Sequence, residues 1–139
     1  MSWGGIKRTS ADIWYSKAIR AAANNECERC GKPADDCSHY FGRRNASSRY
    51  LAGAARNGFA LCRGCHNRLG EHPHEHYIFV RSVIGEGGYD LLVEKAREIQ
   101  KVTKEHRREI AAHYRAECER IQDMRNQGIT GYIEVVSWQ

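Results

Sequence analysis

The sequence predicts an α+β fold, in which a small unit of two strands and a helix is held by metal-binding cysteines and flanked by helices. Three observations support this prediction. Two Cys-x-x-Cys pairs, Cys27/Cys30 and Cys62/Cys65, repeat one spacing in the first half of the chain. An alternating segment at 36–41 and a brief apolar run at 59–61, both near these pairs, have the length of strands. Residues 89–125 contain neither Gly nor Pro, which favours long helix.

A chain of 139 residues fits one domain, or a compact core with a helical extension. We expect a core with its N-terminal helix over residues 1–88, and a helical extension with a C-terminal tail over residues 89–139. Residues 1–8 read as a loose arm. No run of 18 apolar residues occurs, so we expect no membrane span. The N-terminus lacks the apolar core of a secretory signal, so we expect a cytoplasmic protein with reduced thiols.

A helix is predicted directly after the arm. Thr9 or Ser10 can cap it, and Asp12 lies in its first turn. We expect it to end at Asn24-Asn25. Its apolar positions, for which packing is the simplest role, are Ile13, Trp14, Ala18, Ile19 and Ala22.

The two cysteine pairs are expected to bind one structural zinc ion. Each pair sits on a tight turn that brings both sulfurs to one ion, and Gly31 permits the geometry of the first turn. The pairs are separated by 31 residues, more than the usual spacing of about 15–20, so a segment must project from between them. Cys37 and Cys118 have no such partner and are expected to be ordinary thiols.

The segment between the pairs begins with a predicted strand at 36–41, whose alternation places His39 and Phe41 on one side. Residues 42–49 form a basic, polar loop. Residues 59–61 make a second short strand, and 63–69 have helical character. Together these elements predict a ββα unit with the cysteines at its base.

The C-terminal half is predicted to be mainly helical. Residues 77–84 favour helix, although their β-branched side chains leave strand open, and Gly85 to Gly88 should end that element. Residues 89–125 predict one long helix or a broken pair, and 132–138 predict a terminal strand or a docked tail. The helical stripe can form a homodimer interface or an intramolecular hairpin. It contains Leu92, Ala96, Ile99, Val102, Ile110, Tyr114, Ile121 and Met124.

The charge of the chain is uneven. The formal net charge is +5, but residues 1–70 carry 12 Lys/Arg against 5 Asp/Glu, while residues 71–139 carry 10 against 12. The basic excess therefore coincides with the cysteine and histidine motifs. A basic segment beside a metal site favours a polyanionic partner, most simply nucleic acid.

His39, Asn57 and His66 resemble the pattern of the HNH (His-Me finger, ββα-metal) nucleases, in which a strand His is followed by a loop, an Asn, a Cys-x-x-Cys pair and a helix His or Asn. A narrower resemblance, over about residues 12–120, is to the phage NinG/Rap recombination proteins. It rests on Asp12 through Ser16, Ile19-Arg20, Cys27-x-x-Cys30-Gly31, His39-Tyr40, Arg49-Tyr50, Asn57, Cys62-x-x-Cys65, Asn67, Gly70 and Tyr77. This resemblance implies a structure-specific endonuclease that cleaves branched DNA such as recombination junctions, in the host cell cytoplasm if the chain is phage-encoded.

The resemblance also implies roles for individual residues. His39 would be the general base, since a neutral imidazole accepts a proton from water near physiological pH. His66 would bind a catalytic Mg²⁺ or Mn²⁺ ion, and Asn57 would brace the loop against the strand. The arginines expected to contact DNA are Arg43, Arg44, Arg49 and Arg63.

Two positions depart from the family pattern. Many HNH enzymes have a metal-binding Asp directly before the first His, where this chain has Ser38. The second metal ligand is therefore open, with His74 as one prediction and His72, His76, Asp35 or Asp36 as alternatives. The NinG/Rap pattern often has Asn in place of His66, so Asn67 is an alternative ligand. Alternative functions are a restriction-like or packaging-associated HNH nuclease, or a non-catalytic zinc DNA-binding protein.

Overall fold

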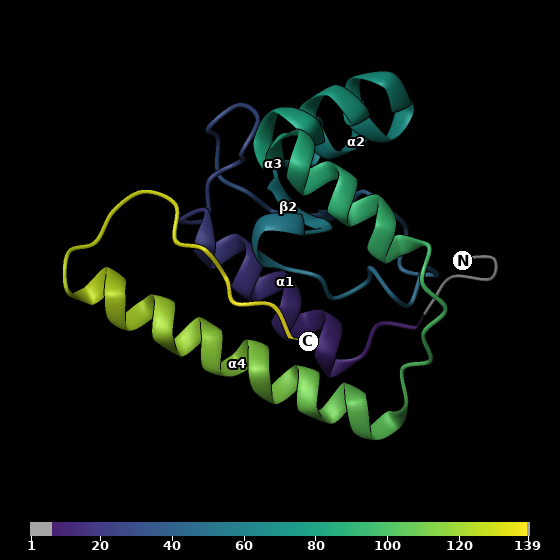
Figure 1. The fold of residues 1–139 in the computed structure, drawn as a ribbon. Coiled ribbons are helices and arrows are strands. Elements are labelled where there is room, and N and C mark those ends of the chain that lie inside the picture. Colours follow the sequence, from purple (N-terminus) through teal and green to yellow (C-terminus); the bar gives the residue numbers. More distant parts are fainter. Residues whose placement is uncertain (1–6, 139) are drawn as a thin grey trace.

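The structure, a computed structural model, describes residues 7–138 and has the predicted α+β architecture. Most of the arm predicted at 1–8 lies outside the described residues. Figure 1 shows the order of the layers: α4, then α1, then a two-stranded sheet, then α2 and α3. The elements are α1 (Ser10–Ala22), β1 (Asp36–His39), the 3-10 turn η1 (Gly53–Ala55), β2 (Gly58–Leu61), α2 (Arg63–Glu71), α3 (Pro73–Ala96) and α4 (Lys104–Asn126).

The two short strands and α2 form the ββα unit. β1 and β2 are antiparallel, with Asp36 opposite Leu61 and His39 opposite Gly58. β2 is buried along its whole length, which explains its continuous apolar character. Because α2 begins directly after β2, its first turn lies at the end of the sheet where β1 begins. The register therefore brings the start of β1 next to α2.

Helix α1 begins and ends as its sequence predicts. Thr9 and Asp12 form a capping box, in which the Asp12 carboxylate accepts the Thr9 backbone N–H at 2.7 Å. After the helix, Asn24 and Asn25 both have positive φ, at 54° and 58°, a conformation that Asn tolerates and that ends helical hydrogen bonding. The buried face of α1 centres on Tyr15 and includes Ile19, whereas Ile13, which was expected to pack, is 40% exposed because it projects from the other side of the helix.

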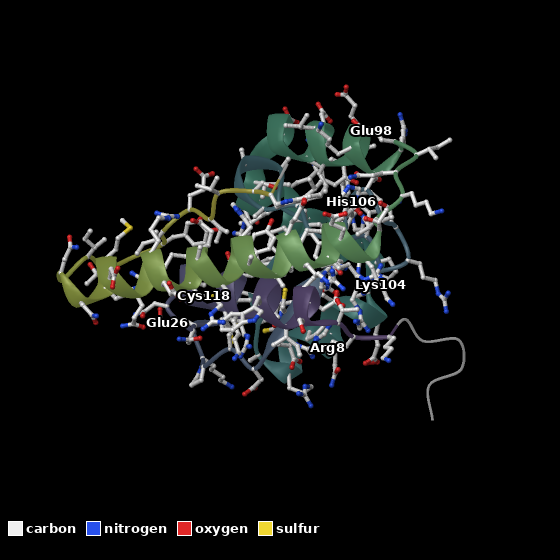
Figure 2. The ribbon with its side chains drawn as sticks, turned by 90° about the horizontal axis from the view of Figure 1, so that it is seen from below. Arg8, Glu26, Glu98, Lys104, His106 and Cys118 are labelled. Carbon is white, nitrogen blue, oxygen red and sulfur yellow. The ribbon has the colours of Figure 1, made fainter. Side chains whose placement is uncertain are left out.

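Helix α4 packs along α1 within the same chain. Its stripe of Ile110, Tyr114 and Ile121 is buried in the core that α1 contributes to. Figure 2 shows α4 crossing in front of α1, with Cys118 on the side that faces α1, where its thiol lies 3.9 Å from the Trp14 carbonyl oxygen. The stripe thus packs intramolecularly, but against α1 rather than in a hairpin with the preceding helix. A homodimer through the C-terminal helices stays a prediction.

Residues 77–84 are helical, as the sequence favours, and belong to α3. The predicted end at Gly85 is confirmed, because Gly85 has the non-helical angles φ 76° and ψ 171°, and a second helical segment of α3 follows this kink. Residues 97–103 separate α3 from α4, so the long helical segment is a broken pair. Helix α3 runs through residue 88, where we expected the core to end. It contributes Phe79, Val80 and Leu92 to a second apolar cluster around the ββα unit.

The C-terminal segment is a docked tail and forms no strand among the described residues. Ile133 donates its backbone N–H to the Ala22 carbonyl oxygen at 3.0 Å, and Val135 is fully buried. The Ser137 hydroxyl oxygen accepts the Ala52 backbone N–H at 3.1 Å. The tail therefore fastens α1 to the loop before η1. Within the described part of the chain, no helix combines the length and apolar character needed to cross a membrane.

Candidate metal centre and polar groove

The four predicted zinc ligands converge in space. The sulfur atoms of Cys27, Cys30, Cys62 and Cys65 all lie within 4.8 Å of one another, and those of Cys30 and Cys62 are 3.6 Å apart. Tetrahedral zinc with bonds of about 2.3 Å places its sulfur ligands about 3.8 Å apart. The four cysteines are therefore close enough to hold one structural zinc ion.

Local backbone geometry creates this convergence. Gly31 adopts φ +82° and donates its N–H to the Cys27 carbonyl oxygen at 2.8 Å, which closes the first turn. Burial opposes ionisation of Cys27, but backbone N–H donors in both cysteine turns outweigh it and lower the pKa of this thiol to about 7. Partial thiolate character at neutral pH favours capture of a metal cation.

A buried ion pair, which sequence reasoning missed, ties the first cysteine turn to β2. The Arg56 guanidinium donates two hydrogen bonds to the Glu28 carboxylate, one at 2.8 Å. The same carboxylate accepts the Ala60 backbone N–H at 2.8 Å. Arg56 also lies over the rings of Phe59 and Tyr132, at 4.6 and 4.8 Å from their centroids. The pair fixes the turn relative to the residue that follows Arg56, Asn57.

Asn57 braces the loop after β1, as predicted. Its side chain is fully buried, and its amide group bonds both backbone atoms of Phe41: the Phe41 N–H donates to Oδ1, and Nδ2 donates to the Phe41 carbonyl oxygen, each at 2.8 Å. The Tyr40 N–H donates to the Asn57 carbonyl oxygen at 2.9 Å. These bonds fix the backbone that immediately follows His39.

A polar groove of about 560 Å³ lies between α1 on one side and β1 with α2 on the other. It gathers side chains from three separate stretches of the chain, 8–20, 35–43 and 63–67. Its lining residues are Arg8, Asp12, Ser16, Arg20, Asp35, Asp36, Cys37, His39, Arg43, Arg63, His66 and Asn67. The predicted base and the predicted metal-binding histidine thus share one open groove.

At one end of the groove His66 meets a carboxylate. The Nδ1 of His66 lies 2.9 Å from Asp36 Oδ2, and Arg63 donates to both Asp36 oxygens at 2.7 and 2.9 Å. The hydrogen bond from Arg63 is the largest cause that lowers the pKa of Asp36, to about 2. Asp36 is therefore an anion at neutral pH and, with His66, offers a cation one oxygen and one nitrogen donor.

His39 lies in the same groove, against the ring of Tyr15, with a centroid separation of 5.6 Å. Its Nε2 is shielded from solvent and has no hydrogen-bond partner among the described residues. Burial, followed by the charge of Arg43, lowers the pKa of His39 to about 4. The imidazole is therefore neutral at physiological pH and retains an acceptor nitrogen.

The other predicted site residues divide into two groups. Arg43 and Arg63 line the groove, whereas Arg44 is exposed and is not among the lining residues. Arg49 forms a two-bond ion pair with Asp12, at 2.9 and 2.7 Å, on the groove-facing side of α1. Arg49 therefore holds a groove carboxylate instead of lining the groove itself.

His74 stands outside the groove. It is exposed in the first turn of α3, and its ring stacks on Tyr77 with a centroid separation of 6.3 Å. Asp36, which the sequence left as one of several alternatives, is the group that contacts His66. Sequence reasoning also missed that Asp12 and Ser16 of α1 line the groove. Their spacing of four residues on one helical face was the available signal.

Fold and site together define a small α+β domain in which a cluster of four cysteines that could hold a metal ion lies beside an open polar groove. Comparison of the chain with models of protein families, with curated proteins and with solved structures finds no match.

Proposed function

We propose that this chain is a metal-dependent DNA endonuclease of the HNH type, with a structural zinc ion at its four cysteines. The observation that carries the proposal is the groove that holds a neutral imidazole, His39, together with the carboxylate–imidazole pair of Asp36 and His66. The proposed specificity for branched DNA, such as recombination junctions, rests on the resemblance to the NinG/Rap proteins. A homodimer that cuts two strands of a junction is part of the same proposal.

His39 is the proposed general base. Hydrolysis of a phosphodiester requires removal of a proton from the attacking water, and the unprotonated ring nitrogen of a neutral imidazole can accept it. The bonds between Asn57 and Phe41 hold the backbone next to His39, so the imidazole keeps its place beside Tyr15. Asn57 is thus a positioning residue.

Asp36 and His66 are the proposed ligands of the catalytic ion. Their donor atoms suit a divalent cation that takes its remaining ligands from water and phosphate, as Mg²⁺ and Mn²⁺ do. A bound divalent ion would supply Lewis-acid stabilisation of the phosphate and of the leaving oxygen.

Arg43 and Arg63 are proposed to bind the substrate phosphate. Both guanidinium groups line the groove next to the histidines, and a planar guanidinium can donate two parallel hydrogen bonds to phosphate oxygens. Arg63 is 68% exposed at its side chain even while it bonds Asp36, so it is accessible to a ligand. The two arginines would neutralise the phosphate that His39 and the ion act on.

A nicking assay tests the proposal. Purified full-length chain is incubated with a synthetic four-way junction and, separately, with a linear duplex, in Mg²⁺ or Mn²⁺. We expect cleavage of the junction, and a loss of about 10²–10⁴-fold in rate for His39→Ala, the usual contribution of a general base. His106→Ala serves as the matched control, since His106 lies at the start of α4 away from the groove.

Each alternative predicts another result. Equal cleavage of the linear duplex would replace junction specificity with a restriction-like or packaging-associated activity. Binding of DNA without cleavage in either metal would leave a zinc DNA-binding protein. Unchanged cleavage by His39→Ala would remove the proposed base.

The pH dependence gives a second test of His39. Because its pKa is lowered to about 4, the imidazole is already unprotonated at pH 6. We expect the cleavage rate at saturating metal to change little between pH 8 and pH 6, and to fall only as the pH approaches 4. A tenfold fall between pH 8 and pH 6 would show that a group with a higher pKa is the base.

A further inference from the structure

One face of α1 carries a row of polar residues. Arg8, Asp12, Ser16 and Arg20 are spaced four residues apart, and all four line the groove. Asp12, Ser16 and Arg20 project from one face of α1 because residues four apart in a helix do so. Arg8 lies just before the N-cap, and we term these four residues the α1 polar row. It lies opposite the wall that holds Asp36 and His66. The apolar face of α1 points elsewhere, into the core shared with α4.

The charge of the α1 polar row is positive once its contacts are considered. Its one carboxylate, Asp12, is 5% exposed and is engaged by Arg49 and by the backbone N–H of Thr9. Arg20, in contrast, bonds only the Ser16 carbonyl oxygen, at 3.3 Å, and forms no ion pair within residues 7–138. A half-buried guanidinium without a carboxylate partner is suited to an anionic ligand.

We propose that the α1 polar row, with Arg20 as its main contact, binds backbone phosphates of the DNA strand beside the phosphate that is cleaved. This inference rests on the proposed function for its ligand. The two walls of the groove then differ in role. Residues of β1 and α2 act on the scissile phosphate, and α1 binds the adjacent part of the strand.

The dimensions of the helix fit this task. From Asp12 to Arg20 an α-helix rises about 12 Å, and Arg8 extends the row beyond the N-cap. One strand of duplex DNA advances about 3.4 Å per nucleotide along the axis, so the row reaches over at least three nucleotides. Arg43, on the loop beside His39, continues the positive charge toward the proposed reaction centre.

The experiment measures binding apart from cleavage. The full-length His39→Ala chain is titrated with fluorescent four-way junction and duplex DNA at several salt concentrations, alone and combined with Arg20→Gln, Arg20→Lys or Arg97→Gln. Arg97 is exposed at the end of α3, outside the groove, and its substitution removes the same charge. Circular dichroism and thermal melting check that each variant is folded.

We expect Arg20→Gln to weaken binding about five- to tenfold near 0.1 M salt, and to reduce the slope of log affinity against log salt by about 0.9, which is the loss of one phosphate contact. Arg20→Lys should keep most of that slope, and Arg97→Gln should match the parent. Equal affinities and slopes for Arg20→Gln and Arg97→Gln would overturn the inference.

The same Arg20 and Arg97 variants, made in the chain that keeps His39, separate the two proposals. If the chain cleaves DNA and Arg20→Gln leaves binding and cleavage unchanged, the α1 polar row is not a DNA contact although the nuclease function stands. If DNA binding depends on Arg20 but no metal supports cleavage, the row stands and the nuclease function fails. Absence of DNA binding by the parent chain would reject both.

Discussion

The four-cysteine cluster and the polar groove are neighbouring regions that differ in how many donor atoms the protein supplies. In the cluster, four cysteine sulfurs lie within 4.8 Å of one another and could supply all four ligands of one metal ion. In the groove, only Asp36 and His66 form a donor pair, and the remaining space of about 560 Å³ is open to solvent. Structural metal sites are closed by protein ligands, whereas catalytic sites keep positions open for water and substrate. The contrast separates the region that holds the fold from the region suited to bind and react.

The two regions are nevertheless mechanically joined. Glu28 lies within the first cysteine turn and holds Arg56, and the next residue, Asn57, braces the backbone beside His39. The Cys62/Cys65 turn opens α2, whose first turn carries Arg63 and His66. Rigidity of the closed region therefore sets the geometry of the open one.

The largest expected effect comes from breaking the cluster. We expect one zinc ion per purified chain by elemental analysis, and Cys62→Ser should lose it together with cooperative folding of the ββα unit. Zinc contributes roughly 10–16 kcal/mol in small zinc-dependent folds, more than the stability of a typical domain.

Cys118→Ser is the matched control, because Cys118 is half-buried on α4 and outside the cluster. It should keep the zinc content and a melting temperature near that of the parent. Full zinc content and an unchanged melting temperature in Cys62→Ser would show that the cluster does not stabilise the fold.

The next effect tests the link between the regions. Asn57→Ala removes both side-chain bonds to Phe41 and leaves two backbone groups without partners, each at a cost of about 1–3 kcal/mol. We expect a destabilisation of about 2–5 kcal/mol in chemical unfolding, with zinc still bound. Cleavage should fall further than the folded fraction does, because His39 loses its support. Proportional loss of folding and activity would make Asn57 purely structural.

A smaller effect is expected at the open site itself. Asp36→Asn should weaken Mn²⁺ binding at least about tenfold in calorimetric titration of the zinc-loaded chain, since a carboxylate ligand is lost. Asp35→Asn is the control: it removes an equal charge from the same groove without a contact to His66. An equal loss of Mn²⁺ affinity in Asp35→Asn would show that the negative charge of the groove, and not a specific Asp36 ligand, accounts for metal binding.

The smallest expected effect is on the free energy of unfolding at acid pH, through the ion pair of Asp12 on α1. Burial opposes ionisation of Asp12, but bonds from Arg49 and Thr9 outweigh it and lower the pKa of Asp12 below 3.8. The pair therefore stabilises the fold fully above the unfolded pKa of about 3.9, and this stability is lost as the pH falls through the lower folded pKa.

Chemical unfolding between pH 5 and pH 2 measures this loss. Asp12→Asn should be less stable at pH 5 and should show a flatter decline with acid than the parent. The two chains should converge in stability as the pH falls through the folded-state pKa of Asp12. Parallel curves for both chains would exclude Asp12 as a source of the pH dependence.

Some features of the fold follow from short stretches of sequence. The capping box of Thr9 and Asp12, the Gly31 turn and the two cysteine pairs depend on residues within four positions of one another, so local patterns predicted them. The broken helical pair was one of two stated alternatives. The break at Gly85 was also predicted from the local sequence, because glycine readily adopts the positive φ found there.

The candidate site was only partly predictable. His39 and His66 do share a groove, but the contact of Asp36 with His66 depends on the β1–β2 register, which brings Asp36 opposite Leu61 at the start of α2. His74 was expected near the metal because it is close in sequence, yet α3 directs it outward. Arg49 was expected on DNA, but a buried carboxylate on α1 holds it.

The sequence by itself determined the closed region, because its four ligands lie on two local turns of fixed geometry. It also determined the order of strands and helix around that region. Only the tertiary structure decided which polar face of α1 lines the groove and which carboxylate meets His66. Those choices depend on the packing of α1 between the sheet and α4, and residues far apart in the chain settle them.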